Sequence, residues 1–232
     1  MINEVFKDDI NTNHVAARDD DQVNDVLRRE RGVFAGVGER PTLVVVHSTV
    51  RPETCLEAAE DAPAATQVVD ALVSGMRVDA VTGDLSLIVG GETDLVEHCR
   101  PAFETMGNAV FHVGALGAGR AGKRSNNLVS LSNVMTTAEG VRLGAAYGID
   151  RETLLALFRE NTADSWVVDN WAFISEEWGD THPTGYEGAA DIVSKDLQLV
   201  LELARAQGCD SPGAAVASQR PALLREFART DE

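Results

Sequence analysis

The segment Gly114 to Asn127, GALGAGRAGKRSNN, divides the sequence into two halves of different character. Before it, short apolar runs typical of strands alternate with helical patterns, whereas the sequence after it carries helical patterns only. Three functional motifs overlap within this one segment, and each predicts a different kind of binding site. Which motif applies decides what the protein binds.

The first motif is a phosphate-binding loop. Gly117, Gly122 and Lys123 have the spacing G-x-x-x-x-G-K, which needs a serine or threonine as the next residue to hold magnesium. Position 124 is an arginine, and Ser125 comes one residue too late. No later strand pattern ends in an aspartate suited to magnesium, so the sequence argues against this motif.

The second motif is the dinucleotide fingerprint G-x-G-x-x-G, formed by Gly117, Gly119 and Gly122. It needs a strand before it, a helix after it, and an acidic residue roughly 20 positions on at the end of a second strand. The strand and the helix are both expected here. Twenty positions on, however, the sequence is still in the same helix, with Glu139 in its middle. The motif therefore fails on its context.

The third pattern is a polar face on the helix that follows. Lys123, Asn126, Asn127 and Ser130 have the spacing i, i+3, i+4 and i+7, which places them on one side of a helix. Asparagine is a poor helix former, so an adjacent pair inside a helix favours a polar role. The positive end of the helix dipole would lower the pKa of Lys123 and suit it to proton transfer. The spacing alone leaves open whether this face is a site or a solvated helix start.

Composition limits the partners. The chain has 232 residues, 20 basic and 37 acidic, and a net charge of −17, which argues against nucleic acid or an anionic membrane as a partner. A small anionic substrate would need a local island of positive charge. The three cysteines, Cys55, Cys99 and Cys209, lack the spacing of a zinc site and are expected to be reduced. With no secretory or membrane-spanning pattern, we expect a cytoplasmic protein that binds no metal.

The periodicity predicts an α/β fold followed by an all-α part. Residues 1 to about 20 are expected to be a frayed tail, and residues 20–37 a short helix. Strands are expected at 41–49, 66–74, 85–91 and 109–114, with a helix at 51–62 that has Pro52 in its first turn. The alternation of strands and helices predicts an α/β layer over this part of the chain.

The rest of the chain, residues 122–232, is expected to be a long interdomain helix and a helical domain. The long helix should cover residues 123–148 and end at Gly148, with further helices at 150–161 and 194–208. The segment WVVDNWAFISEEW carries all three tryptophans, which we expect to fill a helical core.

Four segments, taken in order, resemble the β-hydroxyacid dehydrogenases, the family of 3-hydroxyisobutyrate dehydrogenase and tartronate semialdehyde reductase. They are VVVHSTVRPET, VVDALVSGM, GALGAGRAGKRSNN and SKDLQLVLELARAQG. Together they span roughly residues 20 to 220. The resemblance implies that residues 1–121 are a truncated Rossmann-like, dinucleotide-binding domain. The helical half also resembles the C-terminal domain of 6-phosphogluconate dehydrogenase. The resemblance implies an oxidoreductase that transfers hydride between NAD or NADP and a small 3-hydroxy acid, and that is a dimer or tetramer.

The resemblance also implies roles for single residues. Lys123 would be the catalytic proton donor and acceptor. Ser74 and Gly75 would hold the substrate carboxylate through backbone N–H groups, and Asn126 and Asn127 would contact the substrate. Two further residues are implied on the cofactor side of the active-site cleft: Thr49, beside the nicotinamide ribose, and Lys195.

The chain departs from the family pattern in two places. Family members open with a strand, a G-x-G-x-x-G turn and a helix, and nothing before Val44 is expected to supply these. Without them no helix start receives the pyrophosphate, a loss worth several kcal/mol, or roughly a thousandfold in affinity. In the substrate loop, Leu72 replaces a proline and Met76 replaces a glycine.

Two functions follow as hypotheses. One is an oxidoreductase in shortened form, which predicts missing upstream coding sequence with G-x-G-x-x-G. The other is an inactive remnant that serves as a dimerisation or binding module. In either case we expect an incomplete parallel sheet with an exposed apolar edge at Val44–Val46.

Overall fold

The computed structural model describes residues 10–75, 77–177 and 185–219. The chain divides into two compact units, Met1–Lys123 and Arg124–Glu232, which we call the first and the second unit. Each is described by itself. Within the described residues, no helix has the length and apolar character needed to cross a membrane.

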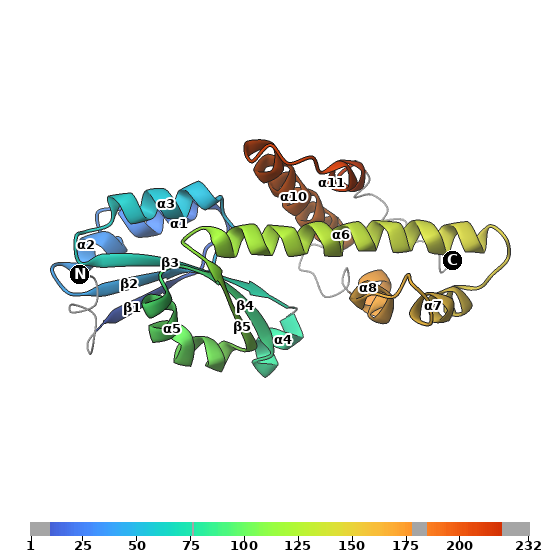
Figure 1. The fold of residues 1–232 in the computed structure, drawn as a ribbon, viewed down its shortest axis with the longest axis horizontal. Helices are drawn as coiled ribbons and strands as arrows, with labels where there is room; N and C mark the ends of the chain where they lie inside the picture. Colours follow the sequence, from blue (N-terminus) through green and yellow to red (C-terminus); the bar gives the residue numbers. More distant parts are fainter. Residues whose placement is uncertain (1–9, 76, 178–184, 220–232) are drawn as a thin grey trace. The chain divides into compact units, whose positions relative to one another are not determined.

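The first unit is built on a five-stranded sheet in the order β1-β2-β3-β4-β5 (Figure 1). All neighbouring strands are parallel except β3 and β4, which are antiparallel. The strands are β1 (Asn11–Val15), β2 (Thr42–Val46), β3 (Thr66–Ser74), β4 (Leu85–Gly90) and β5 (Gly107–Gly114). The four strands expected from apolar runs are therefore confirmed.

Helices cover both faces of this sheet, because alternate side chains of each strand point to opposite faces. On one face, Val44, Val46 and Val68 belong to a core that includes residues of α1 (Asp20–Arg28) and α3 (Pro52–Asp61). On the other, Val45 and Val69 belong to a core with α5 (Thr93–Met106). Two shorter helices are α2 (Val33–Val37) and α4 (Arg77–Thr82).

The N-terminal segment differs from the expected frayed tail. Residues Asn11–Val15 form β1, which pairs along its whole length with β2. The predicted exposed edge at Val44–Val46 is therefore wrong, since β2 lies between β1 and β3 and all of its residues are buried. The apolar pattern did not predict β1, because NTNHV has one apolar residue, Val15, and only that residue is buried.

The region expected to be one helix, residues 20–37, is two helices. Helix α1 begins after Asp19, whose side chain accepts the backbone N–H of Gln22, and it ends at Arg28. The chain then passes through Gly32, where a Cβ would lie 2.7 Å from the carbonyl oxygen of Val26. That close approach of backbone explains why a glycine separates α1 from α2.

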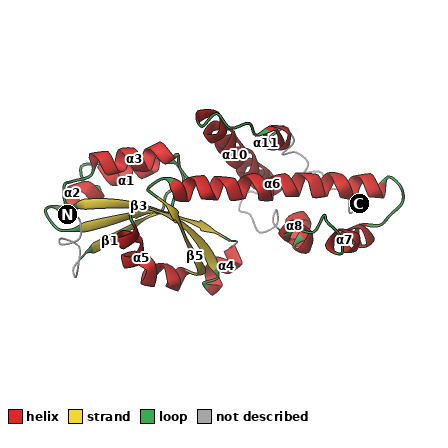
Figure 2. Cartoon of the chain, viewed as in Figure 1, coloured by secondary structure: helices red, strands yellow, loops and turns green. Residues whose placement is uncertain are grey.

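A long helix, α6 (Ala118–Ala145), follows the sheet and begins five residues earlier than the sequence predicts (Figure 2). Gly148, with φ of +80°, follows its C-terminal end. The other helices of the second unit are α7 (Arg151–Arg159), α8 (Trp166–Asp169), a π-helical turn (Phe173–Glu177), α10 (Gly185–Ala206) and α11 (Pro212–Ala217). The described residues after Lys123 contain no strand, as expected. Together these elements confirm the predicted class, an α/β part followed by a helical part.

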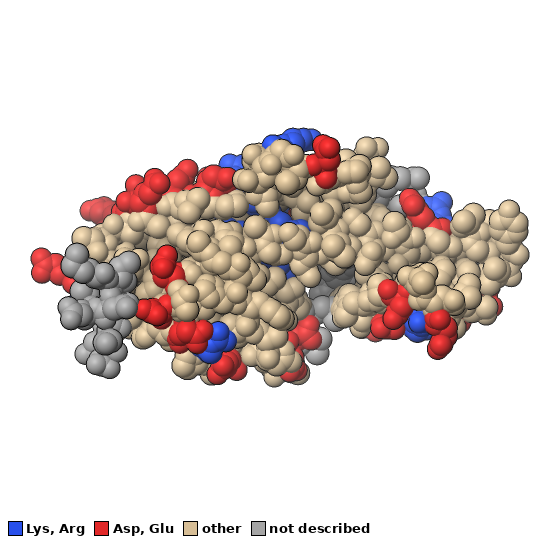
Figure 3. Space-filling view, viewed as in Figure 1, with Lys and Arg blue, Asp and Glu red and all other residues tan. Residues whose placement is uncertain are grey.

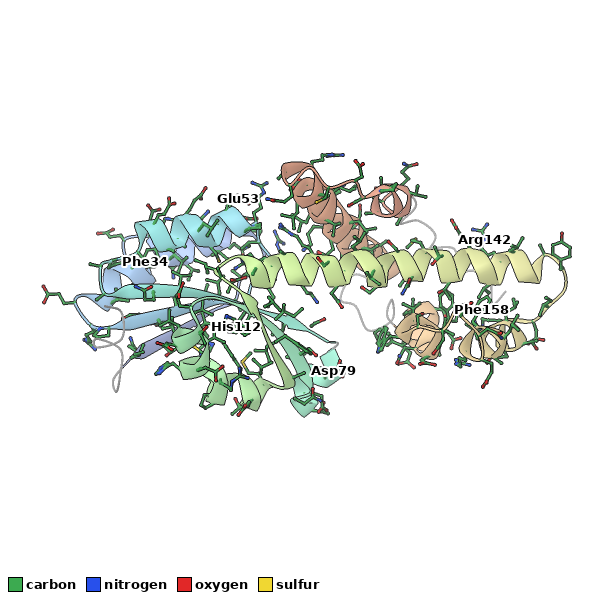
Figure 4. All side chains as sticks on the ribbon, in the orientation of Figure 1. Phe34, Glu53, Asp79, His112, Arg142 and Phe158 are labelled. Atoms are coloured by element: carbon green, nitrogen blue, oxygen red, sulfur yellow. The ribbon has the colours of Figure 1, made fainter. Side chains whose placement is uncertain are left out.

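The core of the second unit takes residues from α6, α7, α8, α10 and α11, and α7 packs closely on α6. A Cβ at Gly140 would lie 3.2 Å from the ring of Phe158, and one at Gly144 would lie 2.5 Å from Leu154, so glycines of α6 allow close contact (Figure 4). Trp171 is buried in this core, as predicted, but Trp166 is 54% exposed and does not fill it. Trp178 lies outside the described residues.

Acidic side chains dominate part of the surface of the first unit. Figure 3 shows them gathered in the region of α3, where Glu53, Glu57, Glu60 and Asp61 are all exposed. Arg28 of α1 pairs with Asp61 at 2.9 Å. Most of the negative charge on α3 is therefore solvated, and it would repel an anionic ligand.

Candidate active site

The first unit brings the predicted catalytic lysine to the predicted substrate loop. Lys123 lies in the second turn of α6, and Ser74 is the last residue of β3. The Nζ atom of Lys123 donates a hydrogen bond to Oγ of Ser74 at 3.0 Å. Both side chains are half-buried. A primary amine and a hydroxyl from two different elements thus meet at the end of the strand.

Gly75 turns the chain away from this contact. Its φ of +144° is a conformation that residues with a Cβ rarely adopt, and a Cβ there would lie 2.8 Å from Leu85 and 3.0 Å from Oδ2 of Asp79. Asp79 comes from α4, below the end of β3 in Figure 4. Leu72 is buried in the strand, and Met76 lies outside the described residues. An anion near Gly75 would be repelled by the neighbouring carboxylate of Asp79. Lys123, whose amine contacts Ser74, supplies the positive charge that would offset this repulsion.

The start of α6 explains the glycine motif. The carboxylate of Asp70, in the middle of β3, accepts the backbone N–H of Gly117 at 2.7 Å and that of Arg120 at 2.9 Å. These are the unsatisfied donors that a helix start offers to an anion. The place that a phosphate would take in a G-x-G-x-x-G turn is therefore occupied by the protein's own carboxylate. This agrees with the argument against both nucleotide motifs.

Asp70 is fully buried, and its surroundings act on its pKa in opposite directions. Burial raises the pKa of the Asp70 carboxyl, while the N–H of Gly117 and the guanidinium of Arg120 lower it, and burial has the larger effect. Arg120 is 1% exposed, and its Nε lies 4.0 Å from the Asp70 carboxylate, too far for a hydrogen bond.

The guanidinium of Arg120 finds its other partners on neighbouring elements. It donates to the carbonyl oxygen of Ser48 and to Sγ of Cys55. Burial raises the pKa of the Cys55 thiol more than Arg120 lowers it. Cys55 is therefore a thiol that accepts a hydrogen bond, and the network ties α6 to β3, to α3 and to the loop after β2. All three cysteines are free, as expected for reduced residues.

The remaining predicted site residues lie on other elements. Thr49, in the loop after β2, is half-buried, and Asn126 on α6 is exposed. In the second unit, Nδ2 of Asn127 donates to Oδ2 of Asp196 at 3.0 Å, and Nζ of Lys195 lies 3.0 Å from Oδ1 of the same carboxylate. Asp196 therefore joins Asn127, which is buried, to Lys195, which is exposed.

Three of these residues were missed by sequence reasoning: Asp70, Arg120 and Asp196. Asp70 left a readable signal, because a carboxylate inside the apolar run VVDALV must find partners when buried. Asp196 follows the predicted Lys195 directly. Arg120 left none, since a basic residue beside a glycine motif is ordinarily solvent-exposed.

The helix starts of the first unit test whether a dinucleotide pyrophosphate fits the described residues. Helix α1 has Asp19 at its N-cap and Asp20 and Asp21 in its first turn, and Asp20 also accepts the backbone N–H of Arg51 at the start of α3. Helix α5 follows Glu92, and α6 is capped by Asp70. These four helix starts, of α1, α3, α5 and α6, carry carboxylates that repel a pyrophosphate, so the group does not fit at any of the four. The short helix α2, which begins after Gly32, has no acidic residue in its first turn. The described residues also contain no cluster of three or more metal-ligating side chains.

Comparison with known proteins identifies two domains that meet at the glycine segment. Residues 5–114 match the NAD binding domain of 6-phosphogluconate dehydrogenase, and residues 117–231 match the domain described as NAD-binding of NADP-dependent 3-hydroxyisobutyrate dehydrogenase. Between them the two matches cover almost the whole chain.

Similar curated proteins come from Pseudomonas aeruginosa. A 3-hydroxyisobutyrate dehydrogenase is 34% identical, over 80% of this chain and 63% of its own length. An NAD-dependent L-serine dehydrogenase is 32% identical, over 79% of this chain and 63% of its own length. This chain therefore spans less than two thirds of the length of these relatives.

A solved structure shares the fold. The 3-hydroxyisobutyrate dehydrogenase of Mycobacterium tuberculosis, solved with L-serine, superposes with a TM-score of 0.74 at 24% identity, covering 94% of this chain and 74% of that one. Two matching domains in the family's order, curated relatives above 30% identity and this fold lead to one conclusion: the chain belongs to the β-hydroxyacid dehydrogenase family.

Proposed function

We propose that this chain is the substrate-handling part of an NAD(P)-dependent oxidoreductase of the 3-hydroxyisobutyrate dehydrogenase type. The enzyme would transfer hydride between the nicotinamide and a small 3-hydroxy acid. The observation that carries the proposal is the contact between Lys123 and Ser74, which joins the amine expected to move a proton to the loop expected to bind a carboxylate. The family match favours this function over an inactive remnant.

Lys123 is the proposed proton donor and acceptor. Its ammonium group would hydrogen-bond the reacting oxygen of the substrate, give it a proton during reduction, and take the proton back during oxidation. Half-burial and the bond to Ser74 hold the amine in one place. The nicotinamide, when bound, supplies the hydride.

The carboxylate of the substrate would be received by backbone N–H groups at Ser74 and Gly75, with Lys123 as the compensating positive charge. Asn126, exposed on the next turn of α6, is suited to orient the reacting oxygen. Asn127 is suited to support it, because Asp196 fixes its amide. Thr49 and Lys195 are the proposed contacts on the cofactor side.

The test compares this chain with an extended form, in which the strand, G-x-G-x-x-G turn and helix that open family members are fused to its N-terminus. Calorimetric titration with NAD and with NADP should show cofactor binding in the extended form and much weaker binding in the 232-residue chain. Equal binding by the two forms would mean that the described residues hold the cofactor without an added pyrophosphate site.

In the extended form, Lys123→Ala should lower kcat by roughly 100- to 10,000-fold and leave the Kd of the cofactor nearly unchanged, because the amine acts on the substrate. Arg142→Ala, an exposed basic residue in the last turn of the same helix, is the control for loss of positive charge. Turnover by Lys123→Ala at the rate of the control would refute the assignment of the proton donor.

We also propose a cytoplasmic protein that self-associates through its helical half. Large apolar side chains are exposed there: Val129, Leu143, Tyr147, Leu157 and Trp166. A set of this kind favours contact with another copy. Light scattering of the purified chain would test it, and a strictly monomeric mass at all concentrations would count against self-association.

A further inference from the structure

A buried carboxylate holds the start of the helix that carries Lys123. We propose that Asp70 is a positioning residue for Lys123, fixing the first two turns of α6 along β3 so that the amine meets Ser74. The inference rests on the proposed function only in that Lys123 does the chemistry. The contacts themselves lie entirely within the first unit.

Asp70 and Ser74 are four residues apart on β3, so their side chains point to the same face of the sheet, about 13 Å apart along the strand. Gly117, directly before α6, and Lys123 are six residues apart, about 9 Å along the helix axis, and the long side chain of Lys123 spans the rest. Two ties therefore join the same helix to the same strand, one at Asp70 and one at Ser74.

Between the two ties, the helix fits closely against β3 and β4. A Cβ at Gly119 would lie 2.7 Å from both Asp70 Oδ2 and the carbonyl oxygen of Ile88, and 2.9 Å from the backbone nitrogen of Gly90. One turn on, a Cβ at Gly122 would lie 2.9 Å from the side chain of Ile88. The glycines thus set the distance of the helix from the sheet.

The pairing of the strands gives this contact a register. Asp70 is paired with Gly90 and Ser74 with Ser86, and on β4 Ile88 lies midway between Gly90 and Ser86. Along the helix, Gly119 lies against Asp70 and Gly90. Gly122 then lies against Ile88, and Lys123 contacts Ser74, in the same order as along the strands. A slide of α6 by one residue would break the bonds to Asp70 and Ser74 together.

Charge makes the first tie strong and specific. A carboxylate that accepts two N–H groups at a helix start is favoured by the helix dipole, and water cannot replace it because Asp70 is fully buried. An asparagine has the same shape but one acceptor oxygen, so it leaves either Gly117 or Arg120 facing an NH₂ group.

The chain offers a direct probe of Lys123, since it has only three lysines: Lys7, Lys123 and Lys195. Reductive methylation with ¹³C-formaldehyde gives each lysine its own methyl signal in NMR spectra, and Lys123→Arg assigns one of them. In Asp70→Asn we expect the Lys123 signal to move towards the shift of a solvated lysine, while the signals of Lys7 and Lys195 stay. No cofactor and no turnover are needed.

Val68→Ala is the matched control, because it removes buried volume from the same strand without touching α6. A Lys123 signal that stays in place in Asp70→Asn, or that moves equally in Val68→Ala, overturns the proposal. If Asp70→Asn does not fold, hydrogen exchange of the unaltered protein decides. The amides of Gly117 and Arg120 must then be protected well beyond those at the exposed start of α7, and fast exchange at both overturns the proposal.

The two ideas fail separately. Turnover that survives Lys123→Ala would end the proposed function and leave the NMR result standing. Loss of turnover in Lys123→Ala, with an unmoved Lys123 signal in Asp70→Asn, would end only the inference about Asp70.

Discussion

His47 follows the apolar run of β2, and its ring has two hydrogen-bonding neighbours. Nδ1 lies 2.6 Å from the carbonyl oxygen of Ala71, which only accepts, so Nδ1 carries the proton and donates. Nε2 therefore accepts from Nδ1 of His14, 2.8 Å away on β1. The rings are inclined by 6°, with centroids 5.1 Å apart, so the bond runs nearly in the plane of both rings.

This arrangement predicts a loss of stability in mild acid. Burial lowers the pKa of His47, and the nearby His14 and Arg120 act in the same direction, against the bond to Ala71. Because the unfolded chain then binds the proton more readily, the free energy of unfolding falls as pH drops from about 6.5 towards the lowered pKa. The loss is up to about 1.4 kcal/mol for each unit by which folding lowers the pKa.

Urea denaturation between pH 5 and pH 8 measures the effect. In His47→Gln the fall below pH 6.5 should become shallower, since glutamine keeps a donor for Ala71 but does not titrate. His98→Gln, at an exposed position on α5, is the control. An unaltered slope in His47→Gln would show that another group governs the acid response.

At the scale of elements, the start of α6 is set by contacts far away in the sequence. The sequence predicts a start at Lys123, where the helical pattern becomes clear, but the helix begins at Ala118. Its first turn, AGRAG, has two glycines and no local cap, and Asp70 supplies the cap from 47 residues away. A helix end that depends on a distant carboxylate cannot be read from local propensity.

The close approach of α6 to the sheet predicts the effect of a single methyl group. Gly119→Ala should destabilise the first unit by several kcal/mol, because its Cβ would lie 2.7 Å from two oxygen atoms and backbone must move. Thermal unfolding followed by circular dichroism measures this.

Gly36→Ala in α2 is the control for alanine in a helix. Nothing lies within 4 Å of a Cβ there, so the change should be neutral or stabilising by up to about 1 kcal/mol. Equal melting temperatures for the two variants would contradict the close packing of α6 on β3 and β4.

At the scale of the whole molecule, the net charge of −17 predicts a response to salt. Exposed acids such as those of α3 repel one another in the folded chain, and salt screens this repulsion. The melting temperature should therefore rise between 10 mM and 1 M sodium chloride, by roughly 2–4 °C for each kcal/mol regained.

Sucrose at matched osmolality separates screening from general solute effects. A variant with Glu57→Lys and Glu60→Lys, both on the exposed face of α3, should melt higher at low salt and respond less to added salt. A melting temperature that does not change with salt, or a variant whose salt response equals that of the unaltered protein, would contradict this. It would show that nearby basic groups already offset the repulsion between the acids.

The sequence by itself determined the strands β2 to β5, the helical second half and the face that carries Lys123, because each depends on a periodic pattern of apolar and polar residues. It did not reveal β1, whose polar residues make an edge strand only beside β2. Nor did it reveal that Asp70 caps α6 or that Asp196 joins Asn127 to Lys195. Those contacts were decided by the tertiary structure alone, because a buried carboxylate finds its donors through space, and no local pattern records which distant N–H groups will face it.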